Sequence, residues 1–160
     1  MSSTASLVCL IFGAWLIIGL YAAPDDVEDP CRPDSHALLS SASRNVARGS
    51  RYRSMSSARC DQLLHGWKEQ WYRFTGEAGS RMATECPKGY SCGTWASLWM
   101  KGTLPTVEEG VVERNICGSY RGNCCMQKDP IISVKNCGDF YVYYLRSTYF
   151  CSAYCGTDDV

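Results

Sequence analysis

Residues 115–125, NICGSYRGNCC, carry three cysteines, and the last two are adjacent. In an extended chain, neighbouring side chains point to opposite faces. Cys124 and Cys125 are therefore expected to reach two different partners, because a bridge between the two themselves would strain the peptide link that joins them. This stretch predicts one strand that is stapled to two separate parts of the chain, and so a fold that depends on disulfides.

The chain begins with the features of a secretory signal peptide. Leu7–Leu20 is a 14-residue apolar run followed by small residues, which is short for a bilayer span. We expect cleavage after Ala22, since a cut after Ala23 would leave Pro24 directly behind it. The alternative is a retained membrane anchor. No later stretch is long and apolar enough for a membrane span, so the sequence predicts a secreted, extracellular protein.

The expected organisation has four parts. They are a signal peptide (1–22), an acidic flexible lead-in (23–30), one cysteine-rich domain (31–155) and a short tail (156–160). Acidic and basic residues balance at 16 each. A nucleic-acid-binding protein would show a clear basic excess, so we expect no nucleic-acid partner.

Cysteine dominates the composition. The chain has 11 cysteines, and Cys9 leaves with the signal peptide. The even number that remains is typical of five disulfides in a secreted protein, and ten cysteines allow roughly 950 pairings, among which spacing alone does not choose. Neither His36 nor His65 lies near a cysteine cluster, and the paired spacing of a zinc site is absent. We therefore expect no metal and no cofactor.

The secondary-structure signals indicate a β protein. Short runs rich in β-branched and aromatic residues follow Trp67: WYRFTG (71–76), GVVERNI (110–116), IISVKNC (131–137) and FYVYYL (140–145). A short helix is expected near His36–Ala47, with Gly49 as its stop. The predicted fold class is a small disulfide-rich, mainly-β domain (α+β at most), with antiparallel sheets, one or two short helices and five disulfides.

Gly89–Gly93 spells G-x-S-x-G, the pattern of a hydrolase nucleophile elbow. That motif needs a strand, a sharp turn and a helix, with the acid and then the histidine following the serine. Both histidines precede Ser91, and Cys92 is adjacent to it. We therefore expect a turn between two structural cysteines, with no catalytic residue and no enzyme activity.

Residues 35–59 contain serines and arginines but no acidic residue. The segment is either a solvated loop between two cysteines or a docking patch for sulfated or sialylated glycans. The aromatic residues of the chain are likewise either core or stacking surfaces for sugar rings. The expected ligand contacts are Arg44, Arg48, Arg51, Arg53, Arg59, Trp99 and Lys101.

Four stretches carry a family resemblance: WYRFTGEAGSRMATEC (71–86), CGTWASLWMKGTLPTVEEGVVERNICGSYRGNCC (92–125), IISVKNCGDFYVYYL (131–145) and CSAYC (151–155). They resemble the cysteine-rich domain of uromodulin and of the pancreatic zymogen-granule membrane glycoprotein. By position, the resemblance implies the disulfides Cys31–Cys137, Cys60–Cys151, Cys86–Cys124, Cys92–Cys155 and Cys117–Cys125.

The resemblance also implies a function, but one feature of it is missing. In the family this domain presents N-linked glycans to bacterial adhesins, on an asparagine shortly after a tryptophan. The present chain has Lys101 at that position, and no Asn-x-Ser/Thr occurs anywhere in it. The glycan-decoy mechanism therefore does not transfer.

The sequence predicts a secreted, non-enzymatic binding or recognition module for glycans or microbial surfaces. The alternatives are a structural component of an extracellular matrix, including a mineralised one, and a secreted disulfide-rich toxin or defence protein. The expected partners are an extracellular glycan, a matrix component or a cell-surface protein. The sequence indicates neither the ligand nor the oligomeric state.

Peptide mapping of the secreted protein under non-reducing conditions tests the disulfide assignment. We expect five bridges and no free thiol, because an even set of cysteines in an oxidising compartment pairs completely. An unpaired thiol or a bound metal ion at these cysteines would contradict it.

Overall fold

The computed structural model describes residues 28–47, 57–126 and 128–158. The expected signal peptide and most of the acidic lead-in lie outside these ranges. Arg48, Arg51 and Arg53 also lie outside them.

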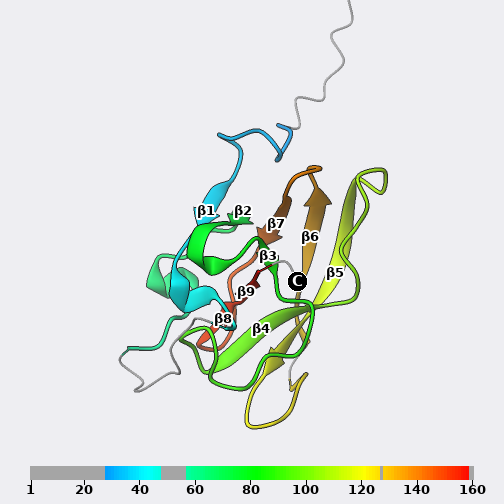
Figure 1. Ribbon diagram of the computed structural model, residues 1–160. Helices are drawn as coiled ribbons and strands as arrows, with labels where there is room; N and C mark the ends of the chain where they lie inside the picture. Colours follow the sequence, from blue (N-terminus) through cyan, green and yellow to red (C-terminus); the bar gives the residue numbers. More distant parts are fainter. Residues whose placement is uncertain (1–27, 48–56, 127, 159–160) are drawn as a thin grey trace, which may run out of the picture.

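In the described residues, nine strands form two sheets (Figure 1). The larger sheet has the order β1-β2-β7-β6-β5-β4-β8, and the smaller one joins β3 to β9. The strands are β1 (Ala37–Leu39), β2 (Gln70–Phe74), β3 (Arg81–Met82), β4 (Ala96–Lys101), β5 (Val111–Ser119), β6 (Lys128–Asn136), β7 (Tyr141–Leu145), β8 (Ser152–Tyr154) and β9 (Gly156–Thr157). The described helical turns are all 3-10: η1 (Ala42–Arg44), η3 (Leu63–His65) and η4 (Gly76–Ala78).

The mainly-β fold class is confirmed, and the four predicted runs correspond to β2, β5, β6 and β7. Two details differ from the prediction. The sheet is mixed, because β1 pairs with β2, and β4 with β8, in parallel. Each of these pairs is joined by a long connection, which parallel pairing requires. The expected helix at 36–47 is wrong, since β1 pairs with β2 and leaves only the single turn η1.

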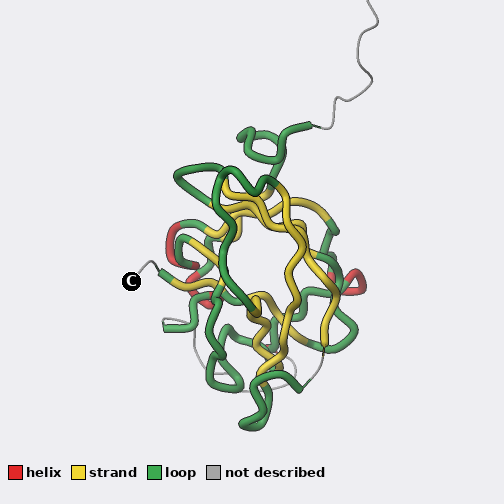
Figure 2. Tube along the Cα trace, turned by 90° about the vertical axis from the view of Figure 1, so that its right-hand side faces the viewer, coloured by secondary structure: helices red, strands yellow, loops and turns green. Residues whose placement is uncertain are grey.

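The larger sheet is curled (Figure 2). Beyond η1, Asn45 forms a parallel bridge with Gly156, and the N–H of Val46 donates to the carbonyl of Gly156 over 2.9 Å. The chain after β1 is thereby joined to the chain after β8. Gly156 and Thr157, which the sequence assigns to a tail, form β9 against β3.

Large aromatic side chains fill the space inside the curl. Tyr143 and Tyr154 are fully buried, and Phe74 contacts Tyr143 edge-on at 5.7 Å between ring centroids. Both hydroxyls are satisfied: that of Tyr143 accepts from the N–H of Met82, and that of Tyr154 donates to the carbonyl of Arg146. A buried tyrosine combines a large apolar area with one polar group that needs a partner. For these residues, the core interpretation of the aromatics holds.

Five disulfides cross-link the fold: Cys31–Cys137, Cys60–Cys151, Cys86–Cys124, Cys92–Cys155 and Cys117–Cys125. They are the same pairs that the family resemblance implies. The adjacent cysteines do reach two partners, but they lie in a turn after β5 and not in a strand. Their side chains diverge because the turn places one toward Cys86 and the other back toward β5.

Gly156 lies where a side chain has no room. A Cβ atom there would overlap the carbonyl oxygen of Ala78 and lie 2.6 Å from the ring of Phe74. We expect Gly156→Ala to lower the free energy of unfolding by about 1–3 kcal/mol, the usual cost of overpacking. Denaturant unfolding with the disulfides intact would measure it.

Gly110→Asn is the matched control. Gly110 has a positive φ of 65°, and no neighbouring atom lies within 4 Å of the position that a Cβ atom would take. Asparagine tolerates that backbone region, so stability should change by less than about 0.5 kcal/mol. Equal effects of the two substitutions would contradict the packing argument.

Candidate functional site

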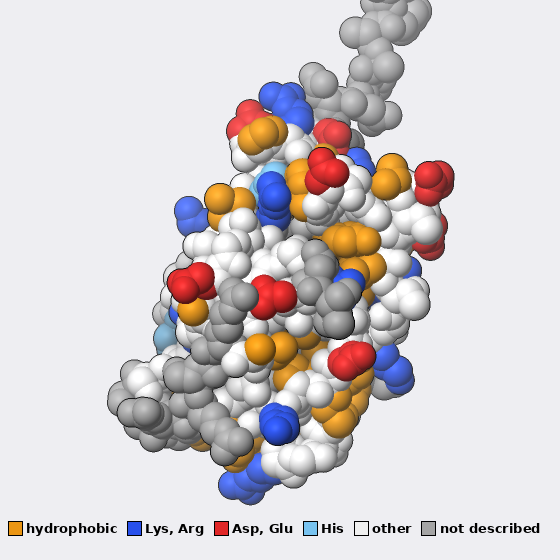
Figure 3. All heavy atoms as spheres, in the orientation of Figure 1, with side chains coloured by type: hydrophobic (Ala, Val, Ile, Leu, Met, Phe, Trp, Pro, Cys, Tyr) orange, Lys and Arg blue, Asp and Glu red, His pale blue; other side chains and the backbone are white. Residues whose placement is uncertain are grey.

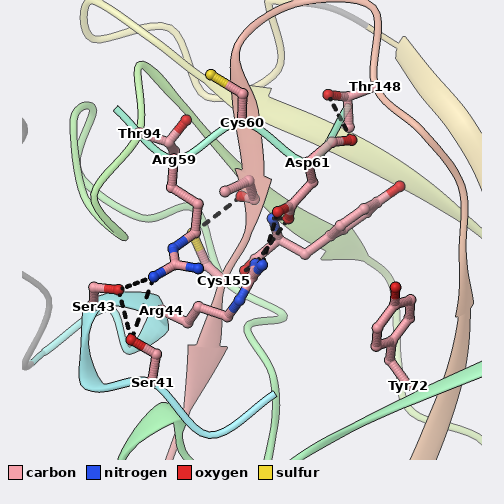
Figure 4. A network of polar contacts seen from close by, with 12 residues as sticks. Ser41, Ser43, Arg44, Arg59, Cys60, Asp61, Tyr72, Thr94, Thr148 and Cys155 are labelled. Atoms are coloured by element: carbon pink, nitrogen blue, oxygen red, sulfur yellow. Dashed lines mark hydrogen bonds and ion pairs between the residues drawn. The ribbon is translucent and has the colours of Figure 1, made fainter. Parts of the chain in front are cut away.

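A buried ion pair lies at the centre of the polar residues in Figure 4. The guanidinium of Arg44 donates to both carboxylate oxygens of Asp61, over 2.7 and 2.8 Å. Their side chains are only 4% and 2% exposed. A bidentate pair of this kind is strong, but each charge is costly when its partner is removed.

The pair joins three segments that are far apart in the sequence. Arg44 ends η1, and its guanidinium also donates to the carbonyl of Tyr154 in β8 over 3.1 Å. Asp61 follows Cys60, and its carboxylate accepts from the N–H of Tyr154 over 2.9 Å. The backbone N–H of Asp61 donates to the carbonyl of Ser152. Both carboxylate oxygens of Asp61 are therefore used within the fold.

Arg59 lies beside this pair and is half-buried. Its guanidinium donates to the hydroxyls of Ser43 and Ser41, over 2.7 and 3.3 Å. Burial, and then the positive charge of Arg44, lower the pKa of Arg59. Within the described ranges no carboxylate forms a salt bridge with Arg59. Its charge is thus held against neutral hydroxyl groups.

A polar cavity of about 430 Å³ opens at these residues, and we call it the arginine pocket. Arg44, Arg59 and Asp61 supply its charges, and Trp67 packs beneath Arg44 with its ring centroid 5.3 Å from the guanidinium carbon. The lining residues are Ser43, Arg44, Ser57, Ala58, Arg59, Cys60, Asp61, His65, Gly66, Trp67 and Gly93.

A second cavity, of about 470 Å³, is mainly apolar, and we call it the aromatic groove. Its lining residues are Cys60, Gln62, His65, Trp95, Ala96, Tyr120, Met126, Phe150 and Cys151. The Cys60–Cys151 disulfide therefore contributes to its wall. Cys60 and His65 also line the arginine pocket, so the two cavities adjoin.

Aromatic rings form the sides of the groove. The rings of Trp95 and Tyr120 are nearly parallel, at 8°, with centroids 6.5 Å apart. Arg121 lies over the ring of Tyr120 at 5.1 Å. A hydrogen bond with Tyr90 is the main cause of the raised pKa of Tyr120. Phe150 on the opposite loop is 63% exposed, which leaves its ring available to a ligand.

Comparison with known proteins assigns the chain to a family. The family model of the uromodulin-like domain matches residues 72–156, more than half of the chain. The chain belongs to the uromodulin-like domain family. This assignment agrees with the resemblance inferred from the sequence and with the five disulfides.

Curated relatives match across a wider range of this uromodulin-like chain. Pancreatic secretory granule membrane major glycoprotein GP2 of Canis lupus familiaris is 43% identical over 129 residues, 79% of this chain and 23% of that protein. The Homo sapiens protein of the same name is 36% identical over 129 residues, 79% and 22%. Uromodulin of Rattus norvegicus is 38% identical over 130 residues, 80% and 18%. The chain thus spans less than a quarter of the length of these relatives.

In the structure of this uromodulin-like domain, the residues expected to contact a ligand lie in different places and do not form one surface. Arg44 is almost fully buried in its ion pair, although it forms part of the lining of the arginine pocket. Arg59 lines the arginine pocket. The indole N–H of Trp99 donates to the carbonyl of Cys124 over 2.8 Å, and this bond anchors the turn that carries the adjacent cysteines.

Lys101 is exposed but lies away from Arg59. It ends β4, whereas the N–H of Arg59 donates to the carbonyl of Gly93, before β4 begins. From Ala96 to Lys101 the strand advances by roughly 17 Å. The two basic groups therefore lie toward opposite ends of β4.

The sequence did not single out the groove residues. The groove combines loops that are far apart in the chain, and no local pattern distinguishes an exposed aromatic ring from a core one. A weak signal was present, since Tyr149 and Phe150 directly precede Cys151 outside any β-like run. Exposure itself is a tertiary property.

Ser91 lies in the expected kind of turn. Its neighbours Tyr90 and Cys92 both have positive φ, at 66° and 59°. The carbonyl of Ser91 accepts from the hydroxyl of Ser97, and Cys92 is fully buried in its disulfide.

Metal-binding clusters and membrane-spanning helices are both absent from the described residues. These residues hold no group of three or more His, Cys, Asp or Glu side chains placed to bind a metal ion. Nor does any helix in those ranges have the length and apolarity of a membrane span.

The ion pair generates a stability prediction. Arg44→Met leaves Asp61 charged and buried without its partner, and should lower the free energy of unfolding by about 3–5 kcal/mol. The double variant Arg44→Met/Asp61→Leu should lose less than the sum of the two single variants, because neither charge is then stranded. Denaturant unfolding of the oxidised protein would measure all three.

Arg32→Met is the matched control. Arg32 pairs with Asp34 over 3.4 Å, but those side chains are 60% and 66% exposed. Exposed pairs contribute about 0–1 kcal/mol. If Arg44→Met lowered the free energy of unfolding no more than Arg32→Met does, the buried ion pair would not be a central contact of the fold.

Proposed function

We propose that this uromodulin-like domain is a secreted, non-enzymatic recognition module that binds extracellular glycans through the aromatic groove. Secretion is supported by the apolar leader at Leu7–Leu20 and by five disulfides, which persist in oxidising compartments. The relatives include a secretory granule membrane glycoprotein, whose name is consistent with this location.

The aromatic groove is the observation that carries the proposal. Binding sites for small ligands are concave and mostly apolar, with a few polar groups that fix the orientation. The faces of Trp95 and Tyr120 and the exposed ring of Phe150 supply apolar surfaces, and Gln62 and His65 supply polar groups. A sugar ring has the same division, with C–H groups on its faces and hydroxyls around its edge. The groove thus matches a saccharide in both size and chemistry.

The disulfide in the wall supports the same function. Cys60 and Cys151 hold the two loops that bear Gln62 and Phe150, and the side-chain amide of Gln62 donates to the carbonyl of Tyr149 over 3.0 Å. The loops are therefore fixed to each other before a ligand arrives. Preorganisation of this kind lowers the entropic cost of binding.

A glycan array probed with the oxidised protein tests the proposal. Phe150→Ser should weaken binding to its glycan ligands about fivefold or more, because one stacking surface of roughly 1 kcal/mol is lost. Titration calorimetry with the glycans found on the array would measure the change.

Tyr149→Ser is the matched control. Tyr149 is the neighbouring exposed aromatic residue, at 82% exposure, but it does not line the groove. Its substitution should leave glycan affinity unchanged. Absence of binding to any glycan, or equal losses in the two variants, would refute the proposed site.

A further inference from the structure

The arginine pocket has a local excess of positive charge in a chain whose formal net charge is zero. Two guanidinium groups, those of Arg44 and Arg59, line it together with one carboxylate, that of Asp61. Arg44 engages both oxygens of Asp61. The charge of Arg59 is therefore not matched by a carboxylate among the residues that line this cavity.

The hydrogen-bonding groups of the pocket wall also favour a ligand that is negatively charged. The Nε atom of Arg59 and the indole nitrogen of Trp67 are buried donors without a hydrogen-bond partner. On the acceptor side, the carboxylate of Asp61 is already used by Arg44 and by the N–H of Tyr154. Buried polar groups in proteins are normally paired. Among the described residues that line the pocket, two donors thus lack a partner while the one carboxylate is already engaged, which favours a ligand that brings acceptor oxygens.

The lowered pKa of Arg59 agrees with this geometry. Desolvation is its largest cause, and repulsion from Arg44 comes next. Both effects disfavour the charged guanidinium, and an anion beside it would offset both. An arginine fork also matches the planar oxygens of a carboxylate and the oxygens of a sulfate.

We propose that the glycan bound by this uromodulin-like domain is acidic, with a sugar ring in the aromatic groove and its carboxylate or sulfate group on Arg59 in the arginine pocket. This inference rests on the proposed function, since it extends the same site. Cys60 and His65 line both cavities, so the cavities are neighbours, and the proposed ligand extends from one into the other.

On the face shown in Figure 3, basic and acidic side chains of the described residues are interspersed. Mixed charges of this kind produce no strong field of one sign. The acidic ligand would thus be selected by one built pocket and not by a general attraction to a basic protein. Binding should accordingly keep much of its strength at moderate salt.

The experiment compares matched acidic and neutral sugars on the oxidised protein. The probes are 3′-sialyllactose against lactose, and a sulfated chondroitin oligosaccharide against its desulfated form, by titration calorimetry. We expect the wild-type protein to bind at least one acidic probe roughly tenfold or more tighter than its neutral counterpart, as expected for a charge-assisted hydrogen bond. The two pairs distinguish a carboxylate from a sulfate ester.

Three variants assign the effect to a residue. Arg59→Gln should abolish the preference for the acidic sugar over its neutral counterpart. Arg59→Lys, which keeps the charge without the fork, should retain part of the preference. Arg32→Gln removes a basic residue that lines neither cavity, and should change nothing. Thermal unfolding of each variant would verify that the fold is intact.

The outcomes separate this inference from the function on which it rests. Equal binding of acidic and neutral sugars, lost in Phe150→Ser, would overturn the acidic ligand and keep the glycan module. An acidic preference that survives Arg59→Gln would also overturn it. A polyglutamate peptide that binds as tightly as the sugars would indicate a protein partner instead. Absence of all binding would overturn both proposals.

Discussion

The bidentate contact between Arg44 and Asp61 constrains most of this fold. It is the point where the N-terminal segment, the Cys60 loop and β8 meet, and none of these is long enough to be stable alone. Burial of two charges is tolerated only when each oxygen and each N–H is satisfied. The backbone of Tyr154 supplies one acceptor to Arg44 and one donor to Asp61, so the pair and the strand support each other.

Two disulfides lie directly beside this contact. Cys60 precedes Asp61, and Cys155 follows Tyr154, so covalent and ionic links act on the same backbone. A disulfide limits the unfolded chain, whereas the ion pair selects one arrangement of the folded chain. The links complement each other in a small domain whose core depends on a few buried aromatic rings.

The site follows from the same constraint. The side chains that fix the three segments also form the wall of the arginine pocket, and the Cys60–Cys151 disulfide lies where that pocket adjoins the aromatic groove. Ligand-binding loops that are held by the structural centre move little, which favours affinity through preorganisation. The structure thus gives a physical reason why a polar pocket and an apolar groove should act on one ligand.

The sequence by itself determined that the protein is a small, disulfide-rich, mainly-β domain. Its signals were an apolar leader, an even set of cysteines and four β-like runs, all of which depend on local composition. The family resemblance implied the disulfide pairing as well, which the spacing of the cysteines alone did not choose. Tertiary structure alone decided which charges and rings are exposed. Arg44 and Arg59 belong to the same serine- and arginine-rich segment, yet one is buried against Asp61 and the other lines a pocket. Asp61 itself showed no signal, since an ion pair across 17 residues and a groove made of distant loops exist only after the sheet has closed.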